Sequence, residues 1–406
     1  MKIGIISINA HTKVLNFASP LHSYAFQQFL TQHGYESVII DYKPSYYGRF
    51  NARHPYDYYV KHPVKNRKKQ ELNLKRWKEL YKEREIRFDK FKRFIKKYYV
   101  TTDVCYNHKM LDTEDVGCDI YICATDVIWK NIPNKGFERG FFLDCDTMKG
   151  KGKIAYAASR GTNPYIGAGV VKEFKRLVEE FDYVSCREKS LYEYVNKKTK
   201  VPAGIVLDPV FLHDEDFYKP LYKNPDKRGY VLIYVVMEDA TDTIEQAVHF
   251  AKERNLEVIE LSEVMENRFI PEGTEHEVIY DIGIEEWLGY MKNADYIFTN
   301  SFHCCCFSII MHKNFYAGKR GGDKLDWLLE LFKLEGRRMT GRKLPADEPI
   351  DYATVDELRK KYKAQSEQFI LGAIEKTQKR LEENADGPKN GLFKRKKELY
   401  GLEDIL

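Results

Sequence analysis

At 406 residues the chain exceeds the length at which one hydrophobic core usually stops growing, so we expect two packed domains with a cleft between them. Lys and Arg total 66 against 61 Asp and Glu, and this near balance argues against a dedicated nucleic-acid binder, although local basic clusters remain for anionic ligands. The eight cysteines show neither a C-x-x-C pair nor zinc-site spacing, which predicts reduced thiols in a cytoplasmic protein without a metal site.

The first half of the chain alternates apolar runs of strand length with segments of helical character. An apolar run at 3–8, a helical segment at 20–33 ended by Gly34 and a second run at 37–40 form a β-α-β opening, which predicts a parallel sheet. Further runs follow at 119–124, 153–158 and 182–186, with a helical segment at 188–198. We therefore expect a first Rossmann-like domain over residues 1–220.

The same alternation returns after a polar stretch at 222–229. Apolar runs occur at 230–236, 256–261, 277–280 and 295–299, and segments of helical character occur at 240–254 and 284–293. This second series predicts another Rossmann-like domain over residues 225–345. The fold class is therefore α/β, with two Rossmann-like domains facing a cleft.

Two segments lie outside this alternation. Within residues 61–100, apolar side chains recur at helical spacing, and we expect a helical insertion of one long helix or a helix pair: Leu74, Trp77, Tyr81, Phe88, Phe91, Ile95 and Tyr98. A C-terminal helix is expected at 351–383, followed by a basic tail at 384–406. Packing of the insertion on the first domain is the main interpretation, with peripheral attachment of its basic face and the tail to an anionic membrane as the alternative. No apolar run approaches the roughly 20 residues of a membrane span, and residues 1–8 are too short for a signal peptide.

The segment 293–303 has the most chemical content. An apolar strand ends in Asn300-Ser301-Phe302-His303, where a new helix is expected to begin. The carboxyl end of a strand in a doubly wound sheet faces the ligand crevice, and a helix start favours an anion. Two interpretations stay open: a site with His303 as a titratable group, or Ser301 acting only as the helix cap with His303 packed.

These motifs, in their order and spacing, resemble the polysaccharide pyruvyl transferase family over nearly the whole chain. The matching stretches are 16–26, Thr125-Asp126-Val127-Ile128-Trp129, 153–159, 182–190 with Arg187-Glu188, Val206-Leu207-Asp208-Pro209 and Asn300-Ser301-Phe302-His303. The resemblance implies a GT-B-like arrangement of the two domains in a cytoplasmic bacterial enzyme. It also implies transfer of a pyruvyl group from phosphoenolpyruvate to a sugar of a surface or capsular polysaccharide precursor, either free or lipid-linked, with release of phosphate and formation of a ketal.

The chain departs from the family pattern at three positions. Ala18 and Cys304 stand where the family usually has glycine, and Lys130 stands where asparagine is common. A larger side chain at the first two positions is expected to narrow the site or change its backbone, which leaves the acceptor and the activity open.

Phosphoenolpyruvate carries a phosphate and a carboxylate, so its site needs several fixed cations. Arg187 follows a strand of the first domain, and Lys319 and Arg320 follow a strand of the second, at the edge where the crevice is expected. A surface salt bridge for Arg187, or a solvated loop for the other two, is the alternative. The remaining substrate contacts expected from the resemblance are Asn16, Trp129, Ser301 and Phe302.

Ketal formation needs protonation of the donor's methylene carbon, a base or hydrogen-bond acceptor for the sugar hydroxyl, and stabilisation of phosphate. His303 is the candidate for the acid or a phosphate contact. Asp126 is the candidate base or hydroxyl partner, with helix capping as its alternative role.

Other features favour structural roles. Cys304, Cys305 and Cys306 are consecutive and point in different directions on a helix, so they are expected to pack rather than bind a metal. The chain lacks a Walker A motif and a G-x-G-x-x-G after its first strand, which disfavours a nucleotide triphosphatase or a dinucleotide enzyme, and we expect no cofactor. Two rival functions remain: a nucleotide-sugar glycosyltransferase, which would bind a nucleotide diphosphate, and a non-catalytic family member, which would bind no small anion.

Overall fold

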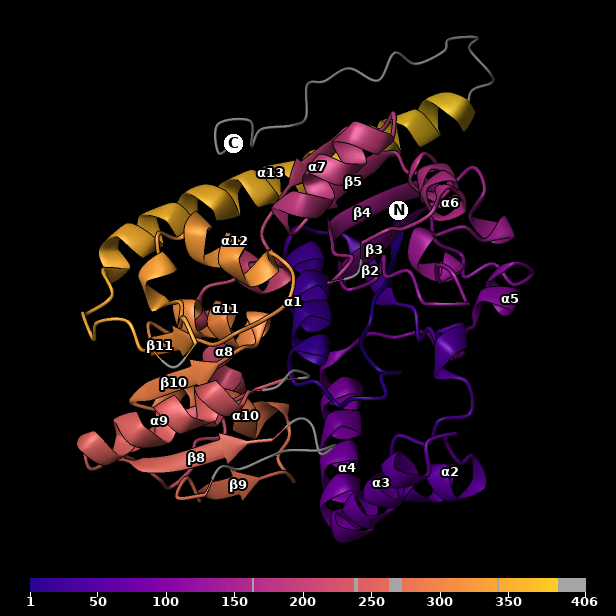
Figure 1. Ribbon diagram of the computed structural model, residues 1–406. Helices are drawn as coiled ribbons and strands as arrows, with labels where there is room; N and C mark the ends of the chain where they lie inside the picture. Colours follow the sequence, from indigo (N-terminus) through magenta and orange to yellow (C-terminus); the bar gives the residue numbers. More distant parts are fainter. Residues whose placement is uncertain (163, 237–239, 263–271, 342, 386–406) are drawn as a thin grey trace.

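The computed structural model describes residues 1–162, 164–236, 240–262, 272–341 and 343–385, and these form two parallel sheets in separate halves of the molecule (Figure 1). The first sheet has the order β2-β1-β3-β4-β5-β6. Its strands are β1 (Lys2–Ile6), β2 (Glu36–Ile39), β3 (Ile120–Asp126), β4 (Gly152–Ala158), β5 (Tyr183–Cys186) and β6 (Ala203–Ile205). The second has the order β11-β10-β7-β8-β9, formed by β7 (Tyr230–Tyr234), β8 (Glu257–Leu261), β9 (Glu277–Ile279), β10 (Tyr296–Thr299) and β11 (Asn314–Ala317).

Helices cover both sheets. Their bounds are α1 (Ala18–Gln32), α2 (Pro55–Lys61), α3 (Arg67–Glu79), α4 (Tyr81–Tyr98), α5 (His108–Leu111), α6 (Ala168–Val178), α7 (Lys189–Lys198), α8 (Glu215–Tyr218), α9 (Thr241–Glu253), α10 (Ile284–Asn293), α11 (Phe302–Ile310), α12 (Lys324–Leu331) and α13 (Tyr352–Ala385). Because parallel strands are buried on both faces, they read as continuous apolar runs, and the central strands β3, β4 and β7 are buried along nearly their whole lengths. The predicted α/β fold of two facing Rossmann-like domains is confirmed, whereas the domain boundaries near 220 and 345 stay predictions.

The expected helical insertion contains α3 and α4. The stripe of α4 that is buried differs from the apolar stripe read from the sequence, because it includes Arg84 and Arg87 beside Phe91 and Phe94. Both guanidinium groups form hydrogen bonds with residues of both halves of the molecule. Arg84 donates to the Ala52 and Lys13 carbonyls of the first half and to the hydroxyl of Tyr280 in the second.

Arg87 makes the same kind of connection one turn along. It donates to the carbonyl of Leu15 at 2.7 Å and to the carbonyls of Ser262 and Tyr280 at 2.5 and 3.2 Å. Backbone carbonyls thus replace the carboxylate partners that buried arginines usually need. Figure 1 shows α4 and α1 standing between the two sheets.

The long helix α13 runs along one side of both halves (Figure 1). Its residues Phe369, Ile370 and Ile374 join the core under the first sheet, while Val355 and Tyr362 join the core of the second. The predicted basic tail lies outside the described residues from 386 onward. Among the described helices, none is long and apolar enough to cross a membrane.

Candidate active site

The strand orders place the site where the two sheets face each other. In the first sheet the chain order reverses between β1 and β3, and in the second it reverses between β7 and β10. Ligands of open α/β sheets bind outside the carboxyl ends of strands at such reversals. Asp126 ends β3, and His303 lies in the first turn of the helix that follows β10.

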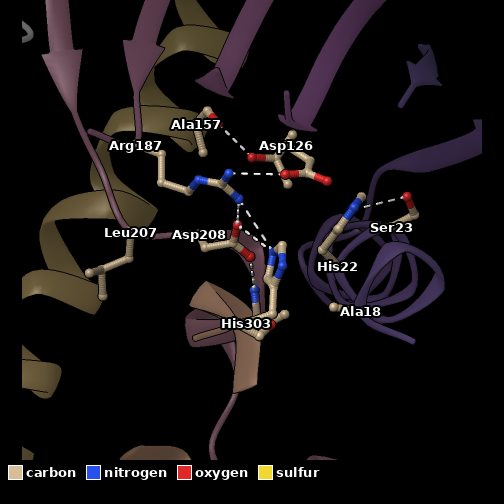
Figure 2. Close-up of polar contacts among 12 residues, drawn as sticks. Ala18, His22, Ser23, Asp126, Ala157, Arg187, Leu207, Asp208 and His303 are labelled. Atoms are coloured by element: carbon tan, nitrogen blue, oxygen red, sulfur yellow. Dashed lines mark hydrogen bonds and ion pairs between the residues drawn. The ribbon is translucent and has the colours of Figure 1, made fainter. Parts of the chain in front are cut away.

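Arg187 is the centre of a buried ionic cluster (Figure 2). It follows β5 and is 3% exposed. One guanidinium nitrogen donates to Asp208 Oδ2 at 2.6 Å, and the other donates to Asp126 Oδ1 at 3.0 Å. The Phe302 ring lies under the guanidinium, with the carbon 4.4 Å from the ring centroid. The arginine therefore holds one carboxylate from the end of β3 and one from the loop after β6, and the aromatic ring packs against its guanidinium.

His303 joins this cluster from the second sheet. Its Nε2 lies 3.2 Å from Asp208 Oδ2 and 3.3 Å from an Arg187 nitrogen. Asn300 fixes the approach of the helix, since its side chain bonds the backbone N–H and carbonyl of Val236 after β7 at 2.7 and 3.2 Å. An Asp208 carboxylate facing Nε2 favours a proton on that nitrogen.

Burial and neighbouring charges shift the pKa values of three side chains in this cluster. For Asp126 and Asp208, burial raises the pKa, but the positive charges of Arg187 and His303 outweigh it and hold both values far below the usual range. His22 of α1 stacks on His303 with ring centroids 5.7 Å apart, and burial lowers the pKa of His22 to about 4. At neutral pH the cluster therefore contains two carboxylates and an uncharged His22.

Beside the cluster a cleft of about 570 Å³ opens between the two halves of the molecule. Its charged lining consists of five cations, Lys13, Lys130, Lys135, Arg320 and Lys324, and two acids, Asp126 and Glu138. Both acids are already occupied, since Asp126 pairs with Arg187 and Glu138 accepts from Ser45 N at 2.9 Å. The cleft therefore has a net positive charge that suits an anionic ligand.

Lys324 is the most buried of these cations, at 8% exposed. Burial, and then the charge of Arg187, lower its pKa to about 8. Its ammonium lies 5.9 Å from the centroid of the Phe302 ring, the same ring that supports Arg187. A lysine desolvated in this way gains most from an anion placed beside it.

Comparison with known proteins fits this geometry. The model of the polysaccharide pyruvyl transferase family matches residues 21–317, a span that includes Asp126, Arg187, Asp208 and His303. The chain belongs to the polysaccharide pyruvyl transferase family. No curated relative matches the sequence.

Two solved structures illustrate the low similarity to proteins of known structure. UGT89C1 of Arabidopsis thaliana, complexed with UDP-L-rhamnose, is 8% identical, with 94% of this chain and 98% of that chain covered and a TM-score of 0.48. UDP-N-acetylglucosamine 2-epimerase from Rickettsia bellii is 10% identical, with 95% and 98% covered and a TM-score of 0.47. Similarity at this level says nothing about activity, and the fold is described from its own two sheets.

The structure brings most of the predicted site residues together. Asn16, Asp126 and Arg320 line the cleft, and Arg187, Phe302 and His303 form the buried cluster next to it. Asn16 also accepts from the N–H of Ala18, the first residue of α1, and Arg320 donates to the Val236 carbonyl. Their assignment as ligand contacts stays a prediction.

Three predicted contacts lie elsewhere. Trp129 is fully buried, stacks on Phe142 and donates to the Phe141 carbonyl, so its indole is part of the core of the first domain rather than the cleft wall. Lys319 is exposed and is not among the residues that line the cleft. Ser301 accepts from the N–H of Cys304 and caps α11, which is the structural alternative read from the sequence.

The departures from the family pattern have different consequences. Cys304 is fully buried in the core of the second domain, with its sulfur 4.0 Å from that of Met291, and is not among the cleft-lining residues. Ala18 is the first residue of α1 and is also buried. Lys130, in contrast, lines the cleft and adds a cation to it.

Sequence reasoning missed several residues of the site. Asp208 and His22 lie within the stretches 206–209 and 16–26 that resemble the family, so the family motifs could have indicated them as site residues. No feature of the sequence pointed to Lys324, Lys13 or Lys135. Lys324 begins a helix and the other two lie in loops, and only the packing of the two halves brings all three to one cleft.

Proposed function

We propose that this protein transfers a pyruvyl group from phosphoenolpyruvate to two hydroxyls of a sugar in a polysaccharide precursor. The observation that supports this most strongly is the excess of cations around a cleft that adjoins the Arg187, Asp208 and His303 cluster. Membership of the family supplies the class of reaction. The donor and the residue roles are inferred from the charges.

The donor is expected at the inner part of the cleft, beside Asp126. Lys324 and Arg320 lie there close enough to interact with each other, and the phosphate and carboxylate of phosphoenolpyruvate would neutralise them. Binding of an anion would raise the pKa of Lys324 again, so this lysine would be fully protonated in the complex. A neutral sugar would not offset these positive charges.

The reaction adds a sugar hydroxyl across the enol double bond of the donor. The methylene carbon gains a proton and becomes a methyl group, the central carbon accepts the hydroxyl oxygen, and phosphate then leaves as a second hydroxyl closes the ketal. His303, with a proton held on Nε2 by Asp208, is the proposed acid. Asp126 stays ionised and is a poor proton acceptor, so we assign it to a hydrogen bond from the attacking hydroxyl.

The acceptor is expected toward the mouth of the cleft. Lys13, Lys130 and Lys135 are exposed there, and none of them forms an ion pair with a carboxylate of the described residues. Burial and the charge of Lys135 lower the pKa of Lys13, which places these two ammonium groups near each other. A negatively charged acceptor, such as a lipid-linked sugar diphosphate, would relieve that repulsion.

Attachment to a membrane surface is a separate proposal, supported by the basic exposed faces of α3 and α4. The exposed apolar side chains Leu72 and Ile86 lie among those charges. Sedimentation with anionic vesicles tests it, and binding that does not weaken with added salt would contradict it.

Calorimetric titration with phosphoenolpyruvate tests the donor site. Replacing Lys324 by Gln should weaken binding by about 10- to 100-fold, because a charge-assisted hydrogen bond is worth roughly 1.5–3 kcal/mol. Lys319→Gln is the matched control, since this lysine is exposed outside the cleft. Binding of a nucleotide diphosphate instead of phosphoenolpyruvate would favour a glycosyltransferase, and an absence of any anion binding would favour a non-catalytic protein.

The assigned acid is tested by product formation. His303→Gln should lower the rate of ketal formation by about 10²- to 10⁴-fold while phosphoenolpyruvate still binds. Loss of donor binding with an unchanged rate at saturation would instead make His303 a phosphate contact.

A further inference from the structure

Three potential metal ligands meet on the first domain, at the edge where the strands end. His11 lies in the loop after β1, Asp41 comes just after β2, and Cys105 lies in a segment that runs beside β2. One atom of each side chain lies within 4.8 Å of the other two. Their sequence separations of 30 and 94 residues from His11 explain why cysteine spacing alone predicted no metal site.

The contacts converge on one ring nitrogen. Nε2 of His11 is 2.6 Å from Asp41 Oδ1 and 3.3 Å from the sulfur of Cys105. A second His, Asp and Cys group, His108, Asp112 and Cys145, is arranged differently: its carboxylate approaches Nε2, whereas its sulfur approaches Nδ1. In the first group, therefore, the carboxylate and the sulfur approach the same nitrogen of the histidine ring.

The backbone holds this arrangement before any ligand binds. Tyr42 pairs with Tyr106, so the residues just before them, Asp41 and Cys105, are carried side by side on neighbouring segments. The N–H of Tyr106 donates to the Asp41 carbonyl at 2.7 Å, and the Asp41 N–H donates to the Thr102 hydroxyl at 3.0 Å. Two of the three ligands are thus fixed by main-chain hydrogen bonds, and only the His11 loop has to adjust.

We propose that His11, Asp41 and Cys105 bind a divalent transition metal ion of the Zn²⁺ type, with water in the fourth position. An imidazole, a carboxylate and a thiolate form a ligand set that Zn²⁺ accepts, and bond lengths near 2.0–2.3 Å place tetrahedral ligands about 3.3–3.7 Å apart. The His11 to Asp41 distance would have to lengthen by roughly 0.7 Å. The thiolate and carboxylate together neutralise the ion.

Two lysines, Lys43 and Lys92, lie close enough to the ligands to interact with them electrostatically. Both act on the thiol of Cys105 and lower its pKa, against the larger effects of burial and of Asp41, which raise it. Metal binding must release the thiol proton. Affinity should therefore rise with pH.

The ion would have a defined structural effect on the active-site cleft. Thr12 and Lys13 follow His11 directly and line that cleft, and Asn16 at the end of the same loop lines it too. Fixing His11 to two segments of the first sheet would fix the position of this wall. The site would therefore act by positioning the cleft loop rather than by touching the reacting atoms.

Cobalt titration of the full-length protein tests the proposal, because Co²⁺ in a thiolate site gives a sulfur-to-metal charge-transfer absorption. We expect one ion per chain with that band, and Cys105→Ser should abolish the band and weaken binding by at least about tenfold. His11→Ala should weaken binding similarly. The control is His108→Ala, which alters the second His, Asp and Cys group and should leave binding unchanged.

The unmodified protein offers an independent measurement. Cys105 is the exposed cysteine, and the other seven are buried, so alkylation monitored by mass spectrometry reports on this thiol alone. Zn²⁺ should slow its alkylation, and a chelator should restore the rate. The proposal is overturned if Zn²⁺ leaves the rate unchanged, if Co²⁺ binds without the thiolate band, or if binding is lost with His108→Ala and kept with Cys105→Ser. None of these results depends on the proposed transferase activity.

Discussion

Replacing Arg187 by Ala tests whether the ionic cluster also holds the fold together. The side chains of Arg187 and Asp208 are 1% and 0% exposed, and that of Asp126 is 19% exposed. The substitution leaves two carboxylates facing each other without their shared cation. Removing one partner of a buried pair typically costs about 3–5 kcal/mol, because the remaining charge has lost both water and its counterion. We expect the free energy of unfolding to fall by about that amount.

Urea unfolding monitored by tryptophan fluorescence measures this change. Arg176→Ala is the matched control, because Arg176 also bridges two carboxylates, Glu173 and Asp144 at 2.8 and 2.9 Å, but is 48% exposed. Exposed pairs contribute about 0–1 kcal/mol, so this variant should unfold close to the parent protein. Adding Asp208→Asn to Arg187→Ala should recover part of the loss, since it removes one uncompensated charge.

The pH dependence has a definite sign. The folded-state pKa values of Asp208 and Asp126 are depressed, so their stabilising effect is present above the unfolded value near 3.9 and is lost as the pH falls below it. The penalty of Arg187→Ala should therefore be largest near neutral pH and shrink toward pH 4. Equal losses for Arg187→Ala and Arg176→Ala at pH 7 would refute the account of a buried cluster.

Three further predictions concern the cleft and the core. Binding of phosphoenolpyruvate should weaken as the pH rises through about 8, where Lys324 loses its proton, and Lys324→Gln should remove this step from a calorimetric pH series. Lys130→Asn should raise the KM of a phosphorylated acceptor and leave donor binding unchanged, measured by initial rates; an equal loss for both substrates would place Lys130 in the donor site. Gly289→Ala should lower the free energy of unfolding, measured in urea, by about 1–3 kcal/mol, because the added Cβ would lie 1.9 Å from the Lys223 carbonyl oxygen. Gly169→Ala in α6 is the control: its added Cβ meets no atom within 4 Å, so the protein should not be destabilised.

The fold could be predicted to a large extent because parallel strands are continuous apolar runs. The run at 230–236 corresponds to β7, and the helical segment at 284–293 corresponds to α10. The short β6 was not assigned as a strand from the sequence. The buried face of α4 was also misplaced, because arginine is read as a surface residue, whereas Arg84 and Arg87 find backbone carbonyls in the interior.

The site was predictable where a strand ends in a polar residue. Asp126, Arg187 and His303 were selected in this way, and they lie together because the carboxyl ends of parallel strands meet at one edge. Their roles stay predictions. Trp129 was not separable from a ligand contact by motif alone, because a tryptophan next to a site residue packs inward or outward according to its tertiary neighbours. Lys324 could not be predicted because no motif marks it. It lies at the start of α12, and only the packing of the two domains brings it near Asp126.

The two arginines of α4 have a consequence for folding cooperativity. Two Rossmann-like domains joined by a simple linker can unfold one after the other, each with its own transition. Here separation would strip Arg84 and Arg87 of their partners in the second half, Tyr280 and Ser262, at about 1–3 kcal/mol for each buried group left unpaired. We therefore expect a single unfolding transition for both domains. We expect the same contacts to limit opening of the cleft, so that a ligand would enter and leave without separation of the two domains.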